Sequence, residues 1–108
     1  MAGHVPAKES LVLTLGADFV HKFKKQPNDP DIPAGTTARI ELYSSADTTD
    51  TIDIWDAVLV DTDEVYFRIE STETDLIPNR AHYRLYVVFP DTPTLDMCWV
   101  YGDVSRKQ

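Results

Sequence analysis

The feature that most constrains this chain is the alternation of apolar and polar residues in short runs, with no helical repeat. No window carries a convincing apolar stripe at positions i, i+3 and i+4, whereas residues 38–43 and 65–70 alternate strictly. Pro, Gly, Asp and Thr interrupt these runs. Alternation bounded by turn residues is typical of strands with one buried face. The sequence therefore predicts an all-β protein.

The runs predict about seven strands. Their spacing of roughly 10–15 residues leaves no room for a crossover helix, so we expect an antiparallel β-sandwich, immunoglobulin-like or fibronectin III-like. Segment 26–35 holds three prolines and is expected to be a loop, because proline lacks the amide donor of a paired strand. Residues 11–106 are expected to form one domain, preceded by an N-terminal arm of residues 1–10. The expected strands are 11–15, 19–23, 38–43, 52–60, 65–70, 81–89 and 96–104.

Composition excludes several classes of protein. The chain has 10 Lys and Arg against 18 Asp and Glu, a net charge of −8. This balance argues against nucleic-acid binding by a basic face and against attraction to anionic membranes. Apolar residues make up 43%, which is too many for a disordered chain, and they are too interrupted for a membrane span. Cys98 is the single cysteine and the first ten residues lack an apolar run, so we expect synthesis and retention in the cytosol.

No motif in the sequence points to catalysis or to a cofactor. His4, His21 and His82 are far apart and have no metal-ligand spacing, and the four glycines are isolated. Cys98 lies in an apolar run, where a cysteine behaves as a small hydrophobe. We therefore expect no enzyme activity, no catalytic residue and no cofactor.

Acidic turns offer a weak alternative, a calcium site. Asp47 and Asp50 fall in one predicted turn and Asp61 and Asp63 in another, and carboxylate oxygens are ligands that calcium prefers. Loops often gather at one end of a sandwich, so the two turns could meet. Aspartate is also common in turns without any metal, because its side chain bonds the nearby backbone.

The aromatic residues divide into two predicted groups. One group falls where a sandwich core needs filling: Trp55, Phe67, Tyr83, Phe89 and Trp99. The other group lies in the opposite phase of its strands or at strand ends, and is the candidate protein–protein interface: Tyr43, Tyr66, Tyr86 and Tyr101.

Tyr83 is also a candidate tyrosine corner. It follows Leu76-Ile77-Pro78 by five residues and precedes two inward-facing strand positions. In such a corner the phenol near the start of a strand bonds the backbone just upstream and satisfies a polar group left unpaired between the sheets.

Several short segments together resemble a known family. They are Leu13 to Phe19, Ile32 to Thr36 leading into Ala38–Leu42, Ile77-Pro78 with Tyr83 to Val88, and a closing Trp99 to Arg106. The pattern resembles the LtfC-type β-sandwich domain of virion proteins from phages of mycobacteria and their actinobacterial relatives. It is similar in layout to the N-terminal domains of baseplate upper proteins of other long-tailed phages. The resemblance covers residues 11–106.

The resemblance implies a non-enzymatic structural protein of the virion, assembled in the host cytoplasm. The expected role is a minor tail or adsorption-apparatus adaptor that docks onto other virion proteins, through an edge strand or the tyrosine-bearing face, as a homo-oligomer or in a symmetric assembly. No nucleic-acid or membrane partner is expected. One alternative is a capsid or head–tail decoration protein. An alternative of another class is a calcium- or glycan-binding module built on the acidic end loops.

Overall fold

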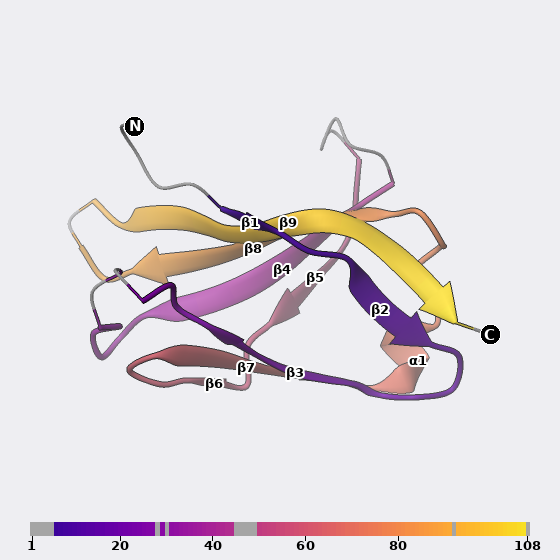
Figure 1. Ribbon diagram of the computed structural model, residues 1–108, viewed down its shortest axis with the longest axis horizontal. Coiled ribbons are helices and arrows are strands. Elements are labelled where there is room, and N and C mark those ends of the chain that lie inside the picture. Colours follow the sequence, from indigo (N-terminus) through magenta and orange to yellow (C-terminus); the bar gives the residue numbers. More distant parts are fainter. Residues whose placement is uncertain (1–5, 28, 30, 45–49, 92, 108) are drawn as a thin grey trace.

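Two β-sheets pack face to face in the computed structural model, which describes residues 6–27, 29, 31–44, 50–91 and 93–107 (Figure 1). The predicted all-β sandwich is confirmed. Within these residues, no helix is long and apolar enough to span a membrane.

The large sheet has the strand order β1-β9-β8-β4-β5, and β2 also pairs with β9. The pairs β9–β8, β8–β4 and β4–β5 are antiparallel, whereas β1 and β2 run parallel to β9. The bounds are Ala7–Lys8 (β1), Leu11–Thr14 (β2), Thr37–Tyr43 (β4), Thr51–Asp56 (β5), His82–Phe89 (β8) and Leu95–Lys107 (β9).

The small sheet has the order β3-β7-β6 and is antiparallel throughout. Its strands are Phe19–Lys24 (β3), Leu59–Val60 (β6) and Glu64–Ile69 (β7). A one-turn helix, α1 (Ser71–Thr74), follows β7 and closes one end of the sandwich (Figure 1). The acidic turn between β6 and β7 joins these two strands in an antiparallel hairpin.

The inward phase of each strand fills the core between the sheets. Trp55, Phe67, Tyr83 and Trp99 are buried as predicted, and Phe89 is partly buried against the same cluster. The indole Nε1 of Trp55 donates to the Asp53 carboxylate at 3.0 Å. The core also takes the alternate aliphatic residues of β4, β7 and β8, which are Ala38, Ile40, Leu42, Val65, Ile69, Leu85 and Val87.

The N-terminal arm predicted for residues 1–10 is wrong in its second half. Ala7 and Lys8 form β1 and pair with Val100 and Tyr101 of β9, so this segment is part of the large sheet. Figure 1 shows β1 and β2 lying along β9. The parallel pairing also corrects the purely antiparallel sandwich, because the first and last segments of the chain run in the same direction side by side. Residues 1–5 lie outside the described part.

The single strand predicted for residues 52–60 is two strands in different sheets. β5 ends at Asp56 in the large sheet, and β6 begins at Leu59 in the small one. Between them the Ala57 amide donates to Ala38 O of β4, and the Val58 amide donates to Tyr66 O of β7. The chain therefore crosses from sheet to sheet while both of these amides stay paired.

The alternation of inward and outward residues along β9 reverses in the middle of the strand. Leu85 pairs with Val100 but Tyr86 pairs with Cys98, so Trp99 is an extra residue on β9. Such a bulge shifts the inward phase by one position. Trp99 and Val100 are consequently both buried, and Tyr101 is exposed.

Candidate functional site

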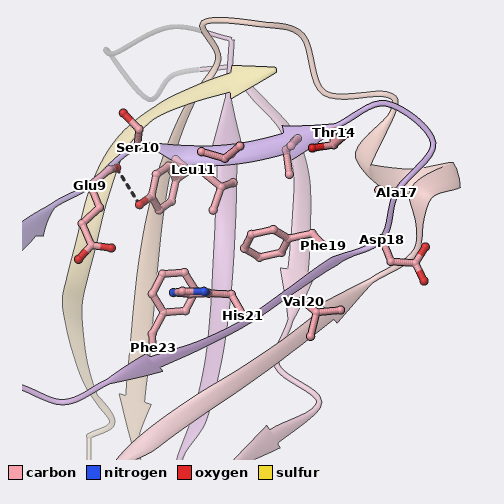
Figure 2. A pocket seen from close by; sticks show the side chains of 13 residues that line it. Glu9, Ser10, Leu11, Thr14, Ala17, Asp18, Phe19, Val20, His21 and Phe23 are labelled. Carbon is pink, nitrogen blue, oxygen red and sulfur yellow. Dashed lines mark hydrogen bonds between the residues drawn. The ribbon is translucent and has the colours of Figure 1, made fainter. Parts of the chain in front are cut away.

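The hydroxyl of Tyr83 does not form the predicted tyrosine corner. The ring is buried, as a corner would require, but the hydroxyl donates to the carbonyl oxygen of Glu9 at 2.9 Å, 74 positions away in the chain. The dashed line in Figure 2 marks this bond. Tyr83 therefore fastens the β1–β2 segment to the sandwich instead of closing the turn just upstream of β8.

A glycine opposite Tyr83 makes room for the same segment. Gly102 pairs with Tyr83, and a Cβ at this position would overlap the carbonyl oxygen of Glu9. The amide of Glu9 donates to Tyr101 O at 3.0 Å. Both backbone groups of Glu9 are thus bonded to the large sheet.

Three of the four candidate interface tyrosines lie on one surface. Cross-strand partners point to the same side of a sheet, and the buried side chains of β4 and β8 define the inner side. We call the opposite surface of β4, β8 and β9 the outer tyrosine face. It is formed by Arg39, Glu41, Tyr43, His82, Arg84, Tyr86 and Tyr101.

The outer tyrosine face is held by an interlocked set of polar contacts. The guanidinium of Arg39 lies 4.9 Å from the ring centre of Tyr86 and its Nε donates to Glu41 Oε2 at 2.6 Å. The hydroxyl of Tyr43 donates to Glu41 Oε1 at 2.8 Å. Both carboxylate oxygens of Glu41 are therefore occupied, and the contacts hold Arg39 and Tyr43 in place.

Electrostatics favour the charged form of Glu41. Burial alone would raise the pKa of its carboxyl. The hydrogen bonds from Arg39 and Tyr43 and the positive charges of Arg39 and Arg84 outweigh burial and lower the pKa below its ordinary value. Burial, together with the hydrogen bond to Glu41, raises the pKa of the Tyr43 phenol, which therefore stays neutral and donates.

The prediction that Tyr43 is an interface residue is wrong, because its side chain is buried. Its position on the outer tyrosine face agrees with its phase in β4. Only 3% of it is exposed, so it supports this face from within. Tyr86 is half-buried and Tyr101 is 38% exposed, and these two can contact a partner. Tyr66 lies on the outer surface of the small sheet, beside Lys22, and is separate from the others.

A hollow of about 480 Å³ opens beside the outer tyrosine face. Tyr101, Arg84 and His82 line it, together with Asp103, whose carboxylate accepts a hydrogen bond from Ser10 Oγ at 2.7 Å. This bond lowers the pKa of Asp103. The hollow therefore combines an aromatic ring with groups of both charges.

The described candidates of the two acidic turns do not meet as the calcium hypothesis requires. Asp61 and Asp63, with Glu64, have carboxylate oxygens within 4.8 Å of one another in the β6–β7 turn. Asp50 lies at the other end of β4, where its carboxylate accepts a hydrogen bond from Ser44 Oγ at 2.8 Å. Asp47 falls outside the described residues. The described members of the predicted set, Asp50 on one side and Asp61 with Asp63 on the other, therefore lie at two ends of the sandwich.

A second surface, which the strand pattern alone did not single out, is a groove between β2 and β3. Two adjoining hollows of about 290 and 320 Å³ share Glu9, His21 and Phe23 among their lining residues. Figure 2 shows Phe19, His21 and Phe23 between β2 and β3, with Val20 on the other side of β3. His21 is on the inward phase of β3 and is nevertheless exposed, because the two sheets do not close over it.

Cys98 lies opposite Tyr86 on β9 and is partly buried. Burial raises the pKa of its thiol, although the charge of Arg84 acts in the other direction. The protonated thiol accordingly belongs to the packing of this sheet.

Comparison with known proteins gives one result for the whole chain. A family model described as LtfC-like, beta-sandwich domain matches residues 5–107. No curated protein matches the chain.

Proposed function

The chain belongs to the LtfC-like β-sandwich domain family, and from this premise we propose that it is a non-enzymatic structural subunit of a phage virion. The family supports a phage-related β-sandwich domain. Our proposal adds the role: a minor tail or adsorption-apparatus adaptor that docks onto other virion proteins and is assembled in the host cytoplasm.

The observation that carries the docking role is the composition of the outer tyrosine face. Tyrosine and arginine are enriched at protein interfaces and dominate their binding energies. Tyr86 and Tyr101 alternate there with Arg39 and Arg84 across adjacent strands. Residues that are dispersed in the sequence thus form one continuous surface.

The internal contacts of this face favour tight docking. Arg39 is fixed against the Tyr86 ring and the Glu41 carboxylate. Side chains that are ordered beforehand lose less conformational entropy on binding, at about 0.5–1.5 kcal/mol for each side chain that need not be immobilised. The face therefore suits a permanent contact in an assembly.

The site of docking distinguishes the tail adaptor from a capsid or head–tail decoration protein. Both roles would use the outer tyrosine face for docking, and neither includes a catalytic reaction. They differ only in the virion protein that contacts Tyr86 and Tyr101. A symmetric array of copies is expected in either case, because virion partners are themselves symmetric.

Incorporation into particles tests the proposal. The double variant Tyr86→Ala/Tyr101→Ala, supplied in place of the native chain, should be incorporated at least about tenfold less, which corresponds to a loss of about 1.4 kcal/mol. The matched control is Val58→Ala/Leu76→Ala, which truncates two exposed side chains elsewhere and should assemble normally. Equal incorporation of both variants, each folded, would contradict docking through this face.

A further inference from the structure

Strand β3 offers an unpaired backbone edge. It is the terminal strand of the small sheet and pairs along its six residues with β7, and no other described strand lies on its second side. β2 lies across the groove from β3 but is part of the large sheet, so it does not pair with β3 (Figure 2). An edge of this kind can accept a further strand through backbone hydrogen bonds.

The outward side chains along this edge are basic. Lys22 and Lys24 point away from the core with Val20, and Arg68 lies beside Val20 on β7. Glu64 is the single outward carboxylate of β3 and β7, and it contacts Lys22 at 3.6 Å. Lys24 has no ion-pair partner among the described residues. The outward residues of β3 and β7 are therefore net positive in a chain of charge −8, and the acidic turn with Asp61 lies beside Lys22 at one end of them.

The inward side chains along the same edge are aromatic and differ in exposure, since His21 is exposed, Phe19 is half-buried and Phe23 is buried. Phe19, His21 and Phe23 form consecutive ring contacts, with centroid separations of 6.3 and 4.6 Å. Across the groove, β2 contributes Leu11 and Leu13 to the lining. A strand added to β3 would place every second side chain over these residues and the others beside the lysines.

We propose that the β3 edge binds an extended polypeptide segment, from another protein, in which apolar and acidic residues alternate. Backbone pairing with β3 requires the extended conformation. The groove over His21 takes the apolar set, and Lys22 and Lys24 face the acidic set. This site is separate from the outer tyrosine face and goes beyond the proposed function.

Lys22 and Lys24 make the edge selective for the charge of the strand that pairs with it. Lysine on an edge strand discourages indiscriminate pairing, since a strand with basic or neutral side chains meets repulsion or an unpaired charge. Opposite charges directly across two strands are favourable and like charges are unfavourable. A segment with carboxylates in the matching phase removes this obstacle, so the same residues that protect the edge select its occupant.

A synthetic peptide of four Val-Glu repeats, blocked at both ends and fluorescently labelled, is the direct probe. Binding to the intact protein is followed by fluorescence anisotropy, and the contacted amides by NMR. We expect shifts of the amides of residues 19–24, with those of Tyr86 and Tyr101 unchanged. Lys22→Glu/Lys24→Glu should weaken binding about tenfold. Lys8→Glu/Lys107→Glu, which alters the net charge equally at two other exposed lysines, should alter it less than about twofold.

Methylated peptides test the backbone pairing. In a strand, alternate amides point to the same edge, so methylation of either the valine or the glutamate nitrogens blocks one edge and leaves the other. One of these two peptides should lose binding and the other should keep it. Equal binding of both would overturn the proposal.

Two further probes test the chemistry of the occupant. Equally tight binding of a block peptide with four glutamates followed by four valines, or of a DNA oligonucleotide, would overturn the proposal in favour of a general anion site. Self-association of the protein that the double lysine variant abolishes would assign the edge to a second copy and overturn it as well.

Discussion

Replacement of Tyr83 by phenylalanine removes one atom that connects distant parts of the chain. The hydroxyl donates to Glu9 O at 2.9 Å, and its ring remains in place in the variant. A net hydrogen bond contributes about 1 kcal/mol, within a range of about 0.5–1.5 kcal/mol. With an unfolding entropy of about 2.1 cal/mol/K per residue, such a loss should lower the Tm by about 4 °C.

The position of the effect is more informative than its size. Because the bond fastens the β1–β2 segment, hydrogen exchange should accelerate at residues 7–11 and stay unchanged at residues 77–81. Urea unfolding followed by the fluorescence of the two buried tryptophans gives the stability. The control Tyr101→Phe removes a hydroxyl that has no hydrogen-bond partner in the described part of the chain, and should alter stability by less than about 0.5 kcal/mol.

Two results would refute this reasoning. Unchanged stability of Tyr83→Phe would show that the hydroxyl contributes nothing to holding Glu9. Faster exchange confined to residues 77–81 would restore the tyrosine corner and contradict the bond to the N-terminal segment.

Three other predictions follow from single contacts. Arg106→Ala removes a buried guanidinium that donates to two carbonyls around α1, and should cost about 2–3 kcal/mol in urea unfolding, with Arg106→Lys recovering part of the loss. Gly102→Ala places a Cβ against the Glu9 carbonyl and should cost about 1–3 kcal/mol, with hydrogen exchange locating the damage in β1 and β2; native protection there would contradict the overlap. Glu41→Gln tests the lowered pKa: the wild type should lose stability as pH falls below about 4.5, the ordinary value, while the variant lacks this component, and identical urea midpoints against pH for the two proteins would refute it.

Local patterns in the sequence were sufficient for the strands and for most of their faces. Alternation placed Ile40, Phe67 and Leu85 in the core, because each strand has one side toward the opposite sheet. It also placed Tyr86 outward, whereas Tyr101 has the alternating phase of Trp99 and faces outward because of the bulge. What the pattern could not give is which strands are neighbours, since pairing depends on contacts between distant segments.

The misplaced features share this origin. The partner of Tyr83 lies in a segment predicted as an arm, and a parallel pair such as β1 and β9 leaves no local signal. The bulge at Trp99 shifts the phase of β9, and no proline or glycine stands at this position to indicate a bulge in the sequence. Tyr43 is on the predicted face, but its burial depends on side chains from other parts of the sheet.

The groove beside β3 escaped prediction for a related reason. His21 has the phase of a core residue, and only the spacing of β2 and β3 leaves it exposed. Three lysines within residues 22–25 were the available signal, because a cluster of basic residues on a strand of an acidic chain is a departure from its overall composition.

Quantitative mass spectrometry of purified particles tests the central claim most directly. Phage particles produced in cells that express the chain would be separated from the cleared lysate and washed in high salt, and the chain measured relative to the structural proteins of the particles. A virion subunit should be enriched in the particles at a fixed copy number per particle that survives washing. Recovery of the chain in the lysate alone, or in particles at a ratio that varies between preparations, would contradict a structural role in the virion.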